Sequence, residues 1–164
     1  MSIKKTLFRS VLIITLFTTY FISPSNGYAN SNEFFCSKEI IERESAIRDY
    51  MSTVDLWWER ILSESVWLER TSHSEKNAKL MEQWYEIISQ RRVASRQLIF
   101  AMTNEITEIK DLNKERESKN HGKASEILER ISIIQTAIDD TKKEVEKLDS
   151  QLEMLYQIIH KINK

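Results

Sequence analysis

The sequence predicts an all-α protein: an elongated, antiparallel, up-down-up three-helix bundle with coiled-coil packing. The chain has 164 residues but only 2 Gly and 1 Pro. Pro24 and Gly27 lie in the N-terminal segment, so Gly122 is the only residue of either type after it. Tight hairpins and phosphate-binding loops depend on these residues. Sheet-rich and nucleotide-binding folds are therefore excluded, and long helices remain.

Residues 1–29 have the three parts of a secretory signal peptide. Basic side chains come first, an apolar stretch at 11–22 follows, and Pro24 precedes small residues. Gly27 and Ala29 fit the −3 and −1 positions that signal peptidase selects. We expect cleavage after Ala29 and export of the remaining chain. A retained membrane anchor is the alternative, but the apolar stretch is shorter than the ~20 residues that span a bilayer.

A short N-terminal extension, residues 30–36, precedes the first predicted helix at 37–71. Apolar residues recur in this helix with the spacing of the a and d positions of a coiled coil: Ile40, Ile47, Met51, Val54, Trp58, Ile61 and Leu68. Beyond Leu68 the same spacing meets only polar residues, and Ser72 with Glu75 can form a capping box. A turn is therefore expected near 71–74; one uninterrupted helix is the alternative.

The second predicted helix, 75–119, has the same spacing with a wider apolar face. Its a and d positions hold Met81, Tyr85, Ile88, Ile99, Met102, Ile106 and Ile109, interrupted by Arg92 and Ser95. Leu80, Trp84, Ile87, Ala94 and Leu98 widen the face, which suits a helix that contacts two neighbours. Gly122 is the residue expected just after this helix ends.

The third predicted helix, 123–163, has the most regular pattern. Ten aliphatic residues and one threonine follow an unbroken 4-3-4-3 spacing: Ile127, Ile131, Ile134, Ile138, Thr141, Val145, Leu148, Leu152, Leu155, Ile159 and Ile162. Burying them stabilises the fold by roughly 15–30 kcal/mol before entropy is subtracted, so partner helices must exist. The competing arrangement is a helix pair that dimerises through this third helix.

Charge narrows the class of partner. Without the three basic residues of the predicted signal peptide, the formal charge falls from −1 to about −4. Nucleic acid and anionic lipid favour basic surfaces, so neither is expected as a partner. The basic group Arg91, Arg92 and Arg96 is interpreted as a helix face that is either solvated or packed along the flank of the core. The expected partner is therefore another envelope or secreted protein, and a homo-oligomer is also compatible with the charge. No membrane span is expected after cleavage of the signal peptide.

The sequence offers no catalytic or metal-binding pattern. His73, His121 and His160 are scattered, no Glu-x-x-His motif occurs, and the expectation is a non-enzyme without cofactor, metal or catalytic residues. Cys36 is the only cysteine. In an oxidising compartment it is either a free thiol or half of an intermolecular disulfide.

Aromatic residues mark candidate contact surfaces. Trp57, Trp58 and Trp84 are expected to be partly or fully buried, whereas Trp67 and Leu56 share a stripe opposite the packed face of the first helix. Exposed Trp and Leu near one end of a bundle are typical of a protein-contact site. Phe34 and Phe35 form a second candidate, which either covers the bundle end or serves as a docking tail.

These observations predict an exported helical protein that acts by protein–protein contact in a bacterial cell envelope. In format, a signal peptide followed by three helices, the chain is similar to the minor pilin subunits of type IV secretion and conjugation machines. The similarity is one of architecture, without a shared motif. A periplasmic coiled-coil holdase chaperone and an inhibitor or immunity protein are the alternatives.

Overall fold

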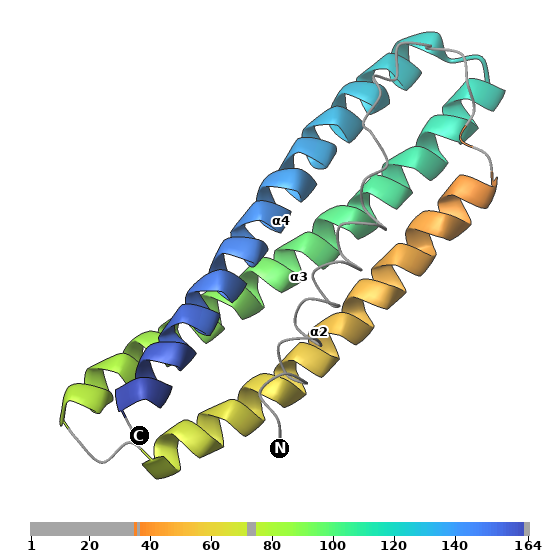
Figure 1. Ribbon diagram of the computed structural model, residues 1–164. Helices are drawn as coiled ribbons and strands as arrows, with labels where there is room; N and C mark the ends of the chain where they lie inside the picture. The colour runs from red at the N-terminus through yellow and green to blue at the C-terminus, as the bar shows by residue number, and fades with distance from the viewer. Residues whose placement is uncertain (1–34, 36, 72–74, 163–164) are drawn as a thin grey trace. The chain divides into compact units, whose positions relative to one another are not determined.

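Three antiparallel helices make up the part of the chain that the computed structural model describes, namely residues 35, 37–71 and 75–162. They are α2 (Ser37–Thr71), α3 (Glu75–Glu117) and α4 (His121–Ile162). Their up-down-up order is visible in Figure 1. The prediction of an all-α three-helix bundle is confirmed, and the observed helix bounds lie within two residues of the expected ones. The predicted signal peptide and the turn residues 72–74 lie outside the described residues.

The α3–α4 pair forms the regular part of the core. Along α4 the predicted positions from Ile127 to Ile159 are buried, apart from Ile134 and Thr141, which are half-buried. Ile162, at the last position of the helix, is 40% exposed. The α3 side chains buried with them include Leu98, Met102, Ile106, Ile109 and Leu112. The apolar positions on α4 are therefore covered within one chain, by α3 and, near the end of α4, also by Ile61 and Leu68 of α2.

Helix α2 packs less regularly. Ile61 and Leu68 are buried as predicted, but Met51 is 48% exposed and its neighbour Tyr50 is 2% exposed. The expectation that Met51 occupies a core position is wrong. Adjacent residues differ by about 100° around a helix, so the buried face of α2 is rotated from the predicted one near this point. Burying a tyrosine also removes more apolar surface from water than burying a methionine.

Ion pairs join α2 to both of its neighbours. Arg43 contacts Glu105 of α3 at 2.8 Å, and Lys110 of α3 contacts Glu44 at 2.8 Å. Arg60 reaches Glu153 of α4 at 3.0 Å. The two exposed pairs contribute little stability each, whereas Glu105 is buried and its charge is compensated by Arg43 and by Gln135.

The turn between α3 and α4 corrects another prediction. Lys119 adopts the left-handed conformation, with φ 58°, and the Asn120 N–H donates to the Glu115 carbonyl at 3.0 Å. This is the helix end that glycine usually occupies. Gly122 instead lies in the first turn of α4, with no positive φ. The expectation that Gly122 directly follows the end of the preceding helix is therefore wrong; Lys119 takes that position.

Phe35 closes the bundle end near that turn. It is 7% exposed and packs against Ile109, Leu112 and Ile127. Its N–H donates to Asn113 Oδ1 at 3.1 Å, and Asn113 Nδ2 donates to its carbonyl at 2.8 Å. The expectation that Phe35 contacts a partner is therefore wrong. Burial of its apolar ring at this site lowers the free energy more than exposure on the surface would. The alternative, in which it covers the bundle end, is the one observed.

Candidate functional site

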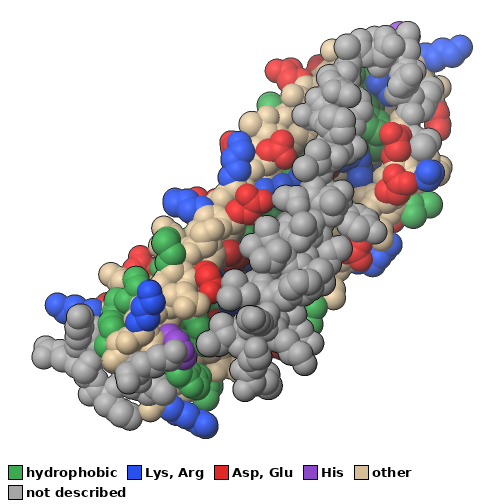
Figure 2. Space-filling view, in the orientation of Figure 1, with side chains coloured by type: hydrophobic (Ala, Val, Ile, Leu, Met, Phe, Trp, Pro, Cys, Tyr) green, Lys and Arg blue, Asp and Glu red, His purple; other side chains and the backbone are tan. Residues whose placement is uncertain are grey.

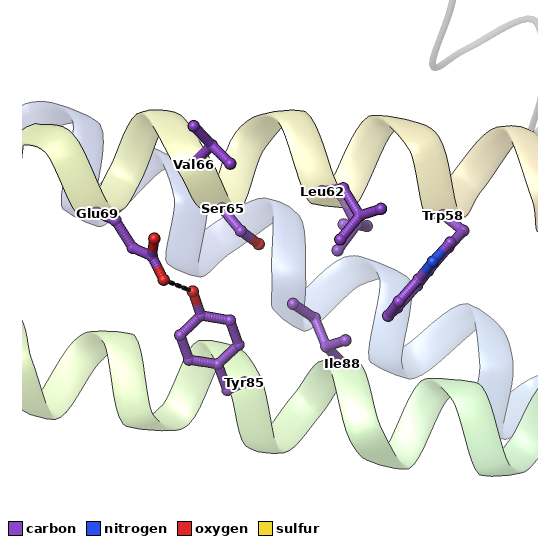
Figure 3. Close-up of a pocket in the computed structure, with 8 residues that line it drawn as sticks. Trp58, Leu62, Ser65, Val66, Glu69, Tyr85 and Ile88 are labelled. Carbon is purple, nitrogen blue, oxygen red and sulfur yellow. Dashed lines mark hydrogen bonds between the residues drawn. The ribbon is translucent and has the colours of Figure 1, made fainter.

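An apolar groove of ≈ 200 Å³ lies between α2 and α3 (Figure 3). Eight residues line it: Trp58, Ile61, Leu62, Ser65, Val66, Glu69, Tyr85 and Ile88. Leu62, Val66 and Tyr85 are 48%, 46% and 42% exposed. Large apolar side chains that stay this exposed next to a groove are typical of a protein-contact surface.

Hydrogen bonds fix the two helices beside the groove. The Trp84 indole N–H donates to Ser65 Oγ at 2.9 Å, and both side chains are buried. Farther out, the Tyr85 hydroxyl donates to the Glu69 carboxylate, as Figure 3 shows. Burial and the adjacent Glu69 raise the pKa of Tyr85 to about 12. Tyr85 therefore remains a neutral hydrogen-bond donor at physiological pH.

The groove has charges of opposite sign at its two ends. Glu69 lies at the end marked by Tyr85. At the other end the Arg92 guanidinium lies 5.3 Å from the centre of the Trp58 ring, a cation–π contact between α3 and α2. The Glu69 and Arg92 side chains are exposed, and Trp58 is half-buried. The surface is thus an apolar strip between an acidic and a basic end.

Trp67 lies on the other side of α2, against α4. Its ring centre is 5.0 Å from that of His160 and 6.0 Å from that of Tyr156. The side chain is still 36% exposed. The expectation that Trp67 lies opposite the packed face of its helix is wrong, because this side of α2 contacts α4. Trp67 is therefore part of an interhelical aromatic cluster with an exposed edge.

A partly compensated carboxylate lies next to this cluster. Arg60 Nε donates to Glu64 Oε1 at 2.7 Å, while Glu64 Oε2 is buried and has no hydrogen-bond partner among the described residues. Burial raises the pKa of Glu64, although Arg60 acts in the opposite direction. Burial also raises the pKa of Tyr156. The α2–α4 contact thus contains a carboxylate that burial disfavours in its charged form.

Exposed apolar side chains gather toward the end of the bundle where α2 and α4 end. Figure 2 shows part of this surface. We call this group the apolar end. It comprises Leu62, Val66, Trp67, Tyr85, Met154, Ile158 and Ile162. Met154, Ile158 and Ile162 follow one another at four-residue intervals, so they form a stripe on α4.

The other predicted contact residues have separate positions. Leu56 is 60% exposed on α2, but it does not line the groove. Phe34 and Cys36 lie outside the described residues, so the predicted docking tail and intermolecular disulfide stay predictions.

Arg91 of α3 is buried and forms an ion pair with the half-exposed Asp149 of α4, which the sequence did not predict. Arg91 is 2% exposed and binds both carboxylate oxygens of Asp149, at 3.0 and 3.1 Å. It also donates to Ser95 and lies 4.7 Å from the centre of the Trp57 ring. Of the two expected alternatives, solvated or packed along the flank of the core, Arg91 is the packed one and Arg92 is exposed. The position of Arg91 seven residues from both Trp84 and Leu98, which are buried, was the available signal.

Two further properties concern the described residues as a group. Among residues 35, 37–71 and 75–162, no three His, Cys, Asp or Glu side chains are placed to share a metal ion. In the same residues, no helix has an apolar stretch of the length needed to cross a bilayer. Comparison with known protein families, with curated proteins and with solved structures found no match.

Proposed function

We propose that this chain is an exported, non-enzymatic protein of a bacterial cell envelope that binds another protein through its apolar end. The concentration of exposed apolar side chains at that end supports this function. Single exposed apolar residues are normal on any protein surface. Seven of them, including Trp67 and Tyr85, lie toward one end of the bundle, where a partner that covers them gains free energy.

The composition of this end also resembles that of energetic centres in protein interfaces. Such centres are enriched in tryptophan and tyrosine and surrounded by residues that exclude water. Trp67 is held in place by Tyr156 and His160, so little side-chain entropy is lost when a partner contacts its exposed edge. Met154 and Ile158 extend the surface along α4.

The cellular context of the proposal comes from the sequence. Removal of residues 1–29 on export leaves a chain that begins at Asn30 and contains the three helices. A minor pilin-like component of a type IV secretion or conjugation machine has this format, and it is the specific role that we propose. The partner is then another subunit of an envelope machine.

Site-specific photo-crosslinking in the native bacterium tests the contact. A photoreactive residue at Ile158 is expected to give one defined adduct with an envelope protein, identified by mass spectrometry. The matched control is Ile133, which is 63% exposed on the same helix but nearer its other end. Equal adducts from both positions, or none from Ile158, would contradict the proposed contact.

Two further measurements separate export and chaperone activity from that contact. The intact mass of the protein from the cell envelope is expected to correspond to residues 30–164. Cytoplasmic protein of full mass would rule out the proposed export. If the chain suppressed aggregation of several unrelated unfolded proteins at near-stoichiometric ratios, the holdase alternative would replace the specific contact.

A further inference from the structure

The α2–α3 groove is left open by the bundle's own described residues. The residues that line it are apolar except for Ser65 and Glu69. Ser65 accepts a hydrogen bond from Trp84, and Glu69 lies at one end of the groove. The α4 positions predicted as an alternative pairing surface between copies are buried against α3. Any self-association that uses an apolar surface must therefore use a different one, and this groove is available.

The charges at the groove ends follow from the antiparallel pairing of the two helices. Tyr85 bonds to Glu69, and Arg92 lies over Trp58, so the residues of α3 run opposite to those of α2 along the groove. Trp58 and Glu69 are eleven residues apart, or about 16 Å along the helix. Leu62 and Val66 lie between them. The order along the groove is basic, apolar, acidic.

We propose that a second copy of this chain occupies the groove, packed antiparallel across a two-fold axis that passes near Leu62 and Val66. A two-fold axis at the middle of the strip reverses it, so Glu69 of each copy faces Arg92 of the other. Leu62 and Val66 then cover each other. A parallel arrangement would place like charges together, which is unfavourable. The strip is thus complementary to itself in one orientation, as an isologous interface requires.

The dimer is expected to be weak, because the strip is short. An interface of this length buries less than the roughly 1,200 Å² found in stable complexes. The groove shares Leu62, Val66 and Tyr85 with the apolar end, so a second copy in the groove leaves Trp67 and the α4 residues Met154 and Ile158 for the envelope partner. The absence of a crosslink from Ile158 would contradict the envelope contact but not the dimer. A protein that stays monomeric would contradict the dimer but not the envelope contact.

Analytical ultracentrifugation of protein expressed from the full coding sequence tests the dimer over concentrations from about 10 µM to 1 mM. A reversible monomer–dimer equilibrium that persists in reductant is expected. Leu62→Glu is expected to weaken dimerisation by about a hundredfold or more, since each dimer would bury two carboxylates. The matched control is Leu56→Glu, which introduces the same charge on a different side of α2 and should leave the equilibrium unchanged.

Charge reversal tests the orientation. Glu69→Lys and Arg92→Glu are each expected to weaken dimerisation by about tenfold, because each places like charges together at both ends. An equimolar mixture of the two single variants should form a heterodimer of near wild-type affinity, since opposite charges then meet at both ends. Asp49→Lys, an exposed charge reversal elsewhere on α2, is the control and should have no effect.

Three outcomes would overturn the proposal. A protein that stays monomeric throughout the concentration range has no second copy in the groove. A dimer that tolerates Leu62→Glu uses another surface. A dimer that Leu62→Glu breaks, but that the mixture of charge variants does not restore, is not antiparallel in the way proposed. Circular dichroism of each variant shows whether the monomer fold is retained.

Discussion

The α3–α4 pair and helix α2 use similar sequences in different ways. Between α3 and α4, a regular run of positions that is aliphatic apart from Thr141 forms a buried core, with Val145, Leu148 and Leu152 each no more than 3% exposed. Along α2 the buried face includes Tyr50, Ser65 and partly buried tryptophans, while Leu62 and Val66 remain half-exposed. The side chains at the regular apolar positions of α4 are therefore used almost entirely for packing within the bundle. On α2 the exposed Leu62 and Val66 adjoin the packed face, whereas the exposed Met154 and Ile158 of α4 lie away from its regular positions.

The largest expected effect is a cavity in the regular pair. Leu148→Ala should lower the free energy of unfolding by about 3 kcal/mol, because Leu148 is 2% exposed and its neighbours cannot fill the space. Leu62→Ala, on α2, should cost less than about 1 kcal/mol, since that side chain is 48% exposed. Urea denaturation measures both. Equal losses would mean that α2 is as tightly packed as the other two helices.

Breaking the ion pair between Arg91 and Asp149 should give the next largest loss of stability. Asp149→Ala leaves the Arg91 charge buried beside Ser95 and should cost about 2 kcal/mol. Arg91→Met should cost less, because the Asp149 side chain is 40% exposed and can be hydrated once its partner is gone. Thermal unfolding of the two single variants and the double variant measures the coupling. A larger loss in Arg91→Met would show that Asp149 depends on Arg91 more than its exposure indicates.

Glu64 should make the α2–α4 contact sensitive to pH. Burial raises its pKa above the ordinary 4.5, so folding favours the protonated form. The stability this provides is complete below pH 4.5 and is lost as pH rises through the folded-state pKa. Glu64→Gln cannot ionise, and its stability relative to the wild-type protein should therefore increase between pH 4 and pH 7. Urea midpoints across this range test the sign; a relative decrease would mean that Arg60 outweighs burial.

The smallest effect is expected in the turn between the two regular helices. Lys119→Gly should raise stability by about 0.5–1 kcal/mol, because glycine adopts the φ of 58° without strain. Lys119→Ala keeps the β-carbon and should give no comparable gain. Thermal melts of the two variants separate relief of backbone strain from loss of the lysine charge.

Spacing within a helix predicted which positions are buried where the apolar pattern is regular. On α4 the 4-3-4-3 spacing marks one continuous stripe, which packs against α3 along its length and against α2 toward both ends. The spacing did not predict which helix lies beside Trp67, which was expected opposite the packed face of its helix but packs against α4. The α2–α3 groove could not be found from the sequence, since it depends on the register of Tyr85 against Glu69 and of Arg92 against Trp58.

The sequence alone determined that the chain forms three long helices, where they begin and end to within two residues, and which side of α4 is apolar. These properties follow from local spacing and from the scarcity of Gly and Pro. Only the tertiary structure decided that Arg91 is buried, that Phe35 closes an end and that Leu62 and Val66 remain exposed. Burial depends on what a neighbouring helix places opposite each residue, and side-chain spacing within one helix does not contain that information.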